Sequence, residues 1–267
     1  MLKRSPPGDL FICRFAGDHS VFVLRYNSVA IKKQNKFTEA EKMKKTTEQS
    51  TKKENVSNIT DLVFILDRSG SMSGLENDTV GGFNSVIEEQ RKKEGRVYVS
   101  TVLFNHESFV LYDRVDIDKI EKMTESDFVV GGSTALIDAM GCAIHHIGNV
   151  HKYARREDVP ENTVFVIMTD GMENSSHIYS SGKVKEMVEK QQKKYGWEFL
   201  FMGANIDAVE TARSYGIDRR GAVQFESDSV GHQLNYRAVC KAVSSIRDEG
   251  VLAESWADEI KSRKKKK

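Results

Sequence analysis

Two short, continuous apolar runs constrain the fold of this chain more than any other feature. Residues 62–66 (LVFIL) and residues 164–168 (VFVIM) have the length of a strand and contain no alternating polar positions. Such runs are typical of strands that are buried on both faces, as in parallel sheets. The sequence therefore predicts a sheet that is covered by helices on both sides.

Segments with the apolar spacing of amphipathic helices alternate with the expected strands. Leu136, Met140, Ile144 and Ile147 recur three or four positions apart and predict one such helix. Further helices are expected around residues 80–87, 184–188, 207–216 and 234–246, and further strands at 97–104, 108–112, 197–202 and 222–225. Strands 97–104 and 108–112 are close enough in sequence to form an antiparallel hairpin. The alternation predicts an α/β fold with a mostly parallel sheet between two layers of helices.

The first 57 residues differ in composition from the rest of the chain. Two apolar runs within residues 1–31, separated by Gly17 and Asp18, predict a short β-hairpin that either docks on the main body or stays loose. Residues 32–57 are rich in lysine and predict a charged linker or a solvated helix. We therefore expect the main domain at 58–249, followed by an extension of the last helix and a basic tail at 250–267.

Charge and cysteine content narrow the class of protein. The formal net charge is +1, which favours neither nucleic acid nor a membrane surface as a partner. The three cysteines are widely spaced and form no CxxC pair, which fits a reducing compartment. The apolar run at residues 10–15 is short and carries Arg14, and no segment reaches the roughly 18–20 apolar residues of a membrane span. We expect a cytoplasmic protein.

Polar side chains cluster where the expected strands end. Asp67, Ser69 and Ser71 follow the strand at 62–66, Thr134 precedes the helix that starts near residue 135, and Asp170 follows the strand at 164–168. In open α/β sheets, binding sites form outside the carboxyl ends of the strands. The sequence therefore predicts that three loops bring these five side chains together.

The chemistry of this set favours a hard divalent cation. All five side chains offer oxygen, without sulfur or imidazole, which suits Mg²⁺ or Mn²⁺ better than Zn²⁺ or Cu²⁺. Neutral hydroxyl ligands leave the positive charge of such an ion largely uncompensated. We expect the bound ion to attract a carboxylate from outside the chain.

The same residues carry a resemblance to a known family. DRSGS at 67–71 has the pattern DxSxS, and Thr134 and the TDG at 169–171 follow in the same order. Over about residues 58–228 the chain resembles von Willebrand factor A domains that have an intact metal-ion-dependent adhesion site. The stretches TVLFNHESFVLYDRV, WEFLFMGANIDAVETA and SYGID resemble small intracellular bacterial proteins of this superfamily.

The resemblance implies a fold, a cofactor and a kind of partner. It implies a Rossmann-like sheet of six strands, the third of which is antiparallel at one edge. It implies Mg²⁺ held directly by Ser69, Ser71 and, in the ligand-competent state, Thr134, and largely through water by Asp67 and Asp170. An acidic side chain of a partner protein would complete the coordination. Because intracellular relatives often work beside AAA+ ATPases, we expect a protein-binding adaptor or regulator that is not an enzyme and takes no small-molecule substrate.

Other polar residues admit a functional and a structural interpretation. Glu173 and Asn174 either line the site or belong to a solvated loop, and Gly131 and Gly132 either allow a close backbone approach or form a simple turn. Cys142, His145 and His146 have the spacing of ligands on one helix face but lack an evident fourth ligand, so packing is favoured. His177 near Asp170 is not accompanied by a G-x-S-x-G motif, which disfavours a catalytic triad.

Two other function classes remain as alternatives. A Mg²⁺-dependent phosphatase also places an aspartate at the end of an apolar strand, but it needs a second acid two residues later, where this chain has Ser69. Binding of nucleic acid through the lysine-rich linker and the C-terminal SRKKKK is disfavoured by the neutral overall charge.

Overall fold

The computed structural model describes residues 10–14, 21–26 and 58–264. The strands are β1 (Leu10–Arg14), β2 (Val21–Tyr26), β3 (Ile59–Asp67), β4 (Arg96–Phe104), β5 (Ser108–Asp116), β6 (Asn162–Thr169), β7 (Glu198–Ala204) and β8 (Ala222–Phe225). The helices are α2 (Glu76–Arg91), α3 (Leu136–Tyr153), α4 (Ser181–Tyr195), α5 (Ala208–Ser214), α6 (Ser229–Glu249) and α7 (Asp258–Lys264). Short 3₁₀ turns occur at η1 (Gly70–Met72), η2 (Ile117–Lys119), η3 (Arg156–Asp158) and η4 (Arg219–Gly221).

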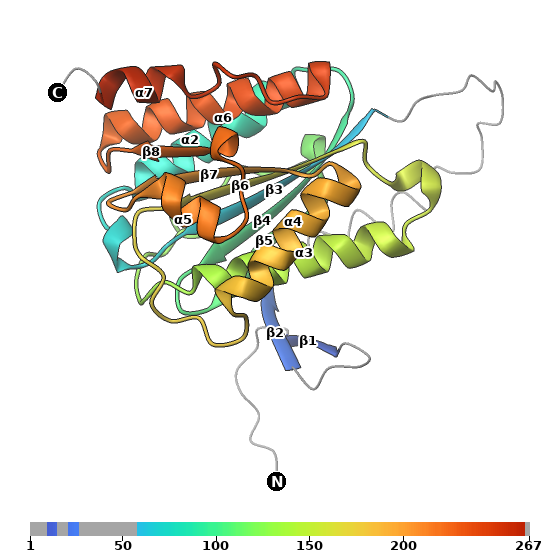
Figure 1. Ribbon diagram of the computed structural model, residues 1–267, viewed down its shortest axis with the longest axis horizontal. Coiled ribbons are helices and arrows are strands. Elements are labelled where there is room, and N and C mark those ends of the chain that lie inside the picture. Colours follow the sequence, from blue (N-terminus) through green and yellow to red (C-terminus); the bar gives the residue numbers. More distant parts are fainter. Residues whose placement is uncertain (1–9, 15–20, 27–57, 265–267) are drawn as a thin grey trace, which may run out of the picture.

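The described strands form one sheet in the order β1-β2-β5-β4-β3-β6-β7-β8 (Figure 1). The pairs from β4 through β3, β6 and β7 to β8 are all parallel. β5 is antiparallel to β4 and marks one edge of the six-stranded part β3–β8. The predicted α/β fold with a mostly parallel sheet is confirmed.

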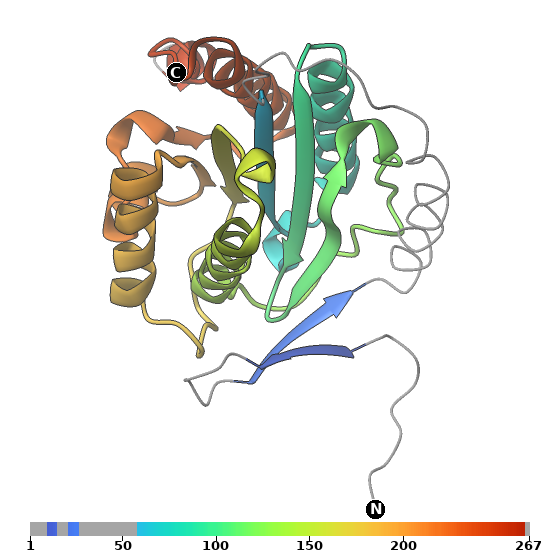
Figure 2. The same cartoon turned by 90° about the vertical axis from the view of Figure 1, so that its right-hand side faces the viewer.

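Side chains of β3 show why the apolar run at 62–66 predicts a sheet covered on both faces. Leu62, Phe64 and Leu66 pack toward α2, α6 and α7, whereas Val63 and Ile65 pack toward α3, α4 and α5. Every residue of β3 is buried. In the turned view of Figure 2, α3 and α4 lie on one side of the strands, and α2 and α6 lie on the other. The result is a three-layer arrangement with a core on each face of the sheet.

The N-terminal strands extend the sheet beyond β5. β1 and β2 pair as an antiparallel hairpin, and β2 pairs in parallel with β5 through Arg25 opposite Phe109 and Tyr26 opposite Val110. The hairpin therefore docks on the free side of β5. The predicted linker at 32–57 lies outside the described residues, and the domain boundaries stay predictions.

The C-terminal segment differs from the expected extension of the last helix. α6 ends at Gly250, which adopts a left-handed conformation with a φ of 73° and terminates the helix. After Gly250 the chain turns back, so that α7 lies along α6 and beside β8 (Figure 1). Trp256 and Ile260 are buried in the same core as α2 and α6. The expectation of one continuous helix was wrong because apolar spacing continues across a glycine that breaks the helix.

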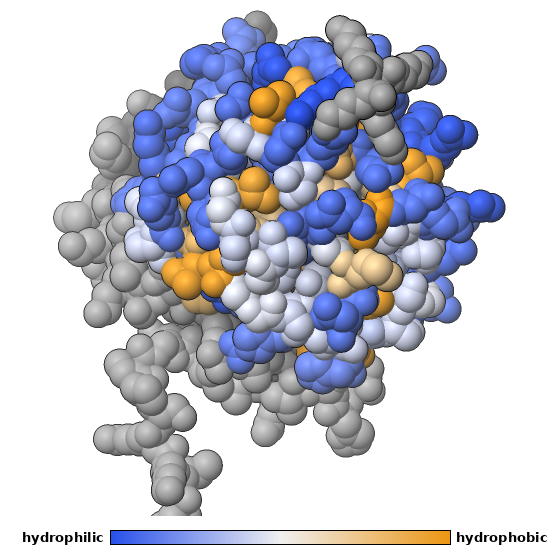
Figure 3. All heavy atoms as spheres, turned by 90° about the vertical axis from the view of Figure 1, so that its left-hand side faces the viewer, coloured by the Kyte–Doolittle hydropathy of each residue, from blue (hydrophilic) through white to orange (hydrophobic). Residues whose placement is uncertain are grey.

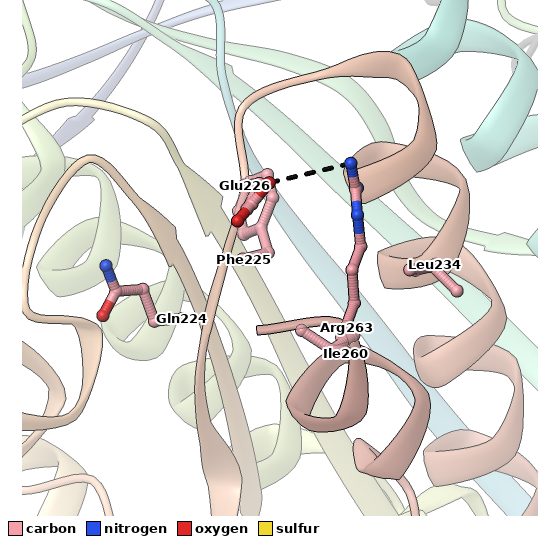
Figure 4. A pocket seen from close by; sticks show the side chains of 7 residues that line it. Gln224, Phe225, Glu226, Leu234, Ile260 and Arg263 are labelled. Carbon is pink, nitrogen blue, oxygen red and sulfur yellow. Dashed lines mark ion pairs between the residues drawn. The ribbon is translucent and has the colours of Figure 1, made fainter. Parts of the chain in front are cut away.

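Ion pairs fix α7 against the sheet. Arg263 donates to both carboxylate oxygens of Asp228, at 2.8 and 2.6 Å, and lies 3.6 Å from a carboxylate oxygen of Glu226. Figure 4 shows Arg263 reaching from its helix toward Glu226 across a small cavity of about 90 Å³. The Trp256 indole N–H donates to the backbone carbonyl of Arg220 at 2.8 Å. Residues 252–264 are therefore an integral part of the described fold.

Candidate metal centre

Three loops meet at the carboxyl edge of the parallel strands. The loop after β3 carries η1, the cyan turn on the left of Figure 1, and the loops before α3 and after β6 lie beside it. Gly70 N–H donates to the carbonyl of Gly132 at 3.0 Å, and Gly131 N–H donates to the carbonyl of Arg68 at 2.9 Å. Asn174 N–H donates to the carbonyl of Thr134 at 3.0 Å. Backbone hydrogen bonds therefore join the three loops.

Asp67 is the deepest member of the predicted set. Its carboxylate is 1% exposed and accepts the N–H of Ser69 at 2.7 Å and the hydroxyl of Thr169 at 2.6 Å. Burial raises the pKa of Asp67, the nearby charge of Asp170 adds to the rise, and the hydrogen bonds from Thr169 and Ser69 oppose it. Both oxygens of the carboxylate are thus fixed in orientation at the base of the cluster.

Ser69, Ser71 and Asp170 form a continuous chain of oxygen atoms. The two serine Oγ atoms lie 3.1 Å apart, and Ser71 Oγ donates to Asp170 Oδ1 at 2.5 Å. Ser69 and Asp170 are buried, whereas Ser71 is exposed. The cluster therefore opens to solvent on the side of Ser71.

Thr134 joins this cluster through its position beside Gly171. A Cβ atom added to Gly171 would lie 3.2 Å from Ser71 Oγ and 3.4 Å from Thr134 Oγ1. Both hydroxyls therefore face the same backbone position directly after Asp170. The structure brings together all five predicted side chains, Asp67, Ser69, Ser71, Thr134 and Asp170.

Gly132 has a steric role in the middle loop. Its φ is 83°, and a Cβ atom at this position would lie 2.4 Å from Nδ1 of His106. The side-chain amide of Asn105 donates to the carbonyl of Gly131 at 2.7 Å, and the Ala135 N–H donates to the backbone carbonyl of Asn105 at 2.7 Å. The absence of a side chain at Gly132 thus allows this loop to approach the residues after β4 closely. A close backbone approach beside a bound ion stays a prediction.

Glu173 and Asn174 organise the loops around the cluster. Asn174 Oδ1 accepts the N–H of Thr134 at 2.9 Å, and Glu173 Oε2 accepts the N–H of Ile137 at 2.8 Å. Glu173 Oε1 also accepts the N–H groups of Ser175 and Ser176 at 2.9 and 2.7 Å. Glu173 therefore satisfies a donor in the first turn of α3 and shapes its own loop.

Sequence reasoning missed Asp138, which anchors the loop after β6. Its buried carboxylate accepts the N–H groups of His177, Ile178 and Tyr179 at 2.8–3.0 Å. It also missed the hydrogen bonds of Thr169 and Asn105. Thr169 stands inside the TDG motif, so a signal was present, whereas Asp138 looks like an ordinary acidic residue in the first turn of a helix.

The charge of the cluster is not balanced from within the described residues. Neither Asp67 nor Asp170 forms an ion pair with a lysine, arginine or histidine in the part of the chain that the structure describes. Two carboxylates and three hydroxyls offer only hard oxygen ligands, the set that Mg²⁺ and Mn²⁺ prefer. A divalent cation therefore fits both the donor chemistry and the uncompensated charge.

The alternative sites found in the sequence have structural roles. Cys142 is buried in the core, where burial raises the pKa of its thiol, and His146 Nε2 lies 2.7 Å from Asp113 Oδ1. His145 Nδ1 lies 3.3 Å from the hydroxyl of Tyr179. His177 is exposed, and its Nδ1 lies 3.7 Å from Asp138 Oδ2. Within residues 10–14, 21–26 and 58–264, no group of three or more His, Cys, Asp or Glu residues is placed to hold a metal ion.

Comparisons with solved structures identify the fold. The chain resembles the vWF domain of the type V pili tip protein Mfa5 from Porphyromonas gingivalis, with a TM-score of 0.51 and 9% identity over 74% of this chain and 99% of that one. It also resembles proximal thread matrix protein 1 from the mussel byssus, with a TM-score of 0.52 and 11% identity over 68% of this chain. That match spans 47% of the mussel protein, about half its length.

These likenesses define the class of fold and nothing finer. An open, mostly parallel sheet with its polar cluster at the carboxyl edge is the architecture of a Rossmann-like α/β protein. The particular fold is that of the von Willebrand factor A domain, as the resemblance predicted. No protein-family model matches the sequence, and no curated protein matches it significantly. Among the helices that the structure describes, none has the length and apolar character needed to cross a bilayer.

Proposed function

We propose that this protein is a divalent-metal-dependent protein-binding module that captures an acidic side chain of a partner. The observation that carries the proposal is the convergence of five oxygen-bearing side chains from three loops, whose two carboxylates form no ion pair within the described residues. The von Willebrand factor A fold supports it, because such domains are typically metal-dependent interaction modules.

In this proposal the five residues divide into two roles. The hydroxyls of Ser69, Ser71 and Thr134 would hold Mg²⁺ or Mn²⁺ directly. Asp67 and Asp170 would orient them and balance part of the charge, largely through water. The metal would supply a positive charge that an anionic side chain can reach. Ser71 is the exposed member of the set, so that side would admit the partner's carboxylate.

The surroundings of the cluster favour a macromolecular partner over a free anion. Val129 and Met172, on the two loops that flank Thr134 and Asp170, are 61% and 72% exposed. Figure 3 shows this face of the molecule, where hydrophobic residues stand separately among weakly polar and hydrophilic ones. Apolar side chains beside an ion give a partner protein contacts that a small anion cannot use. The resemblance suggests an AAA+ ATPase as one class of intracellular partner.

Metal linkage tests the proposal in the protein alone. The melting temperature of the wild-type chain should rise in MgCl₂ or MnCl₂ over its value in EDTA, because an ion that binds only the folded state stabilises it. At a metal concentration of 100 times the dissociation constant, the gain is about 2.7 kcal/mol. Ser69→Ala should abolish this rise while leaving the melting temperature in EDTA nearly unchanged.

Ser73→Ala is the matched control. Ser73 belongs to the same loop but lies outside the DxSxS pattern, and its hydroxyl only donates to the carbonyl of Gly70 at 2.9 Å. This variant should keep the full response to metal. Equal melting curves of the wild type in EDTA and in millimolar metal would refute the proposed metal site.

We propose further that the module is not an enzyme. Ser69 stands where a phosphatase of this type needs its proton-donating acid, and its hydroxyl contacts Ser71 instead. A generic phosphatase substrate should not be turned over with Mg²⁺ present. Turnover by the wild type that disappears in Asp67→Asn would indicate that the protein is a hydrolase and not a binding module.

A further inference from the structure

A groove of about 910 Å³ lies between α3 and α4, apart from the candidate metal centre. None of the five residues proposed to form that centre lines it. α3 and α4 lie side by side in both ribbon views (Figures 1 and 2). At the floor, Gly148 lets the helices approach closely, since an added Cβ atom would lie 3.3 Å from Nε2 of Gln191.

The walls of the groove are built by one edge of each helix. His145, Asn149 and Lys152 stand four and three positions apart on α3, so they share one face of that helix. Lys183, Met187 and Lys190 repeat the same spacing on α4. The two helices thus present parallel rows of side chains to whatever lies between them.

The groove has charge of one sign. Lys152, Lys183 and Lys190 are exposed along it, and no aspartate or glutamate lines it. Lys183 also lies 3.3 Å from Glu186 on the outer side of α4, whereas Lys152 and Lys190 form no ion pair within the described residues. Burial lowers the pKa of His145, and the nearby His146 lowers it further, so the positive charge of the groove comes from its lysines. The groove is complementary to an anionic ligand.

Apolar side chains mark both ends of the groove. Ile178, just before α4, is 44% exposed, and Tyr195, at the end of α4, is 52% exposed. They are separated by the length of α4, about 22 Å at 1.5 Å per residue. Met187 lies half-buried between them. An amphipathic helix of about four turns has this length and this succession of apolar contacts.

We propose that the groove between α3 and α4 docks an acidic amphipathic helix of a protein partner. The partner's carboxylates face Lys152 and Lys190, and its apolar side chains cover Ile178, Met187 and Tyr195. This surface is separate from the metal centre and gives the module a second contact. The chain's own residues 32–55 are unsuited to it, because they hold eight lysines and four glutamates.

A protein helix suits the groove better than a nucleic acid. Nucleic acid binding of this kind depends on aromatic faces that are free to stack on bases. Trp197, which lines the groove, is only 4% exposed and stacks on Phe165 at 5.3 Å. Aliphatic residues such as Ile144, Val159 and Pro160 line the groove instead.

Selection from a random peptide library tests the proposal. A displayed library of random peptides of about 16 residues, the length of four helical turns, is selected on the full wild-type chain in EDTA. The absence of metal keeps the proposed metal site out of the experiment. Enriched peptides should carry an excess of Asp and Glu, with apolar residues three or four positions apart. Their dissociation constants should rise about tenfold or more when Lys152→Glu is combined with Lys190→Glu, because the acidic peptides then meet negative charge.

Lys185→Glu combined with Lys193→Glu is the matched control, because both exposed lysines belong to α4 but lie outside the groove. This variant should bind the selected peptides as the wild type does. Absence of enrichment, enrichment of neutral or basic peptides, or equal binding by both double variants would overturn the proposal. A labelled single-stranded oligonucleotide that binds more tightly than the best peptide, and loses binding in the Lys152 and Lys190 variant, would assign the groove to nucleic acid instead.

Discussion

The two ends of β3 hold buried aspartates in opposite electrostatic settings. Asp61, near the start of the strand, and Asp67, at its end, are each 1% exposed. The carboxylate of Asp61 lies 2.9 Å from the guanidinium of Arg114 and 2.7 Å from Nε2 of His151. Asp67 instead accepts hydrogen bonds from uncharged donors, among them the backbone N–H of Ser69 and the hydroxyl of Thr169. The chain therefore compensates the charge of Asp61 with its own Arg114 and leaves Asp67 without an ion-pair partner among the described residues.

This difference separates a structural acid from a proposed binding acid. Arg114 adopts a positive φ of 46° in the irregular part of β5, and its guanidinium also lies 4.8 Å from the ring centroid of Tyr98. A non-glycine residue rarely takes this conformation, so the surrounding contacts must hold it there. No comparable arrangement supplies a cation to Asp67 within the described residues. An external divalent ion would compensate the charge of Asp67 at one end of β3, as Arg114 compensates the charge of Asp61 at the other end.

The largest expected effect is the loss of Asp61. Asp61→Ala leaves Arg114 and His151 without their shared carboxylate, and removing one partner of a buried ion pair costs about 3–5 kcal/mol. Urea denaturation should report this loss equally with and without Mg²⁺. Asp118→Ala is the control, because its exposed carboxylate lies 3.9 Å from Arg91 and should cost little. If Asp61→Ala lowers the free energy of unfolding no more than Asp118→Ala does, the proposed contrast between Asp61 and Asp67 is wrong.

A smaller loss is expected from Asp138, whose carboxylate is held mainly by backbone donors, with the exposed His177 ring 3.7 Å away. Asp138→Ala removes the acceptor of three N–H groups and should cost about 2–3 kcal/mol. The amides of His177, Ile178 and Tyr179 should then exchange faster with solvent in hydrogen-exchange measurements. Because the same loop carries Asp170, the metal-induced rise in melting temperature should also shrink. Unchanged protection of the three amides would show that the loop after β6 keeps its structure without the carboxylate of Asp138.

Removing the charge of Asp67 should not lower the free energy of unfolding when metal is absent, in contrast to the losses expected at Asp61 and Asp138. Asp67→Asn keeps the shape of the side chain but removes a buried charge that has no described cationic partner. In EDTA its free energy of unfolding should equal that of the wild type or exceed it by about 1 kcal/mol. In Mg²⁺ the order should reverse, because only the wild type gains binding energy. A large destabilisation in EDTA would show that the charge of Asp67 is already compensated.

The smallest expected effect is the pH-dependent stability that the contact between His146 and Asp113 contributes. The hydrogen bond and the charge of Asp113 raise the pKa of His146, against the effects of burial and of Arg114. This stabilising contribution is fully present below the ordinary histidine pKa of about 6.5 and is lost as the pH rises through the raised value. Asp113→Asn should therefore cost about 0.5–1 kcal/mol more near pH 6 than near pH 9. Urea denaturation at both pH values measures the difference, and a pH-independent cost would contradict it.

Local sequence patterns predicted the sheet and the members of the polar cluster. The apolar run at 62–66 and the polar residues after it are contiguous, so strand, loop and site residues were visible together. The role of Asp138 was not visible, because its partners lie 39–41 positions away and are backbone groups. The return of the chain after Gly250 was missed for a related reason. Apolar spacing at Leu252 and Ile260 indicates burial but not the direction in which a helix runs.

The most direct test of the central claim is the anomalous scattering of manganese in crystals of the protein grown with MnCl₂. We predict an anomalous peak among the side-chain oxygens of Ser69, Ser71 and Thr134, with Asp67 and Asp170 behind it. The peak should be absent in crystals of Ser69→Ala grown under the same conditions. A wild-type map with no peak among these five side chains would contradict the account.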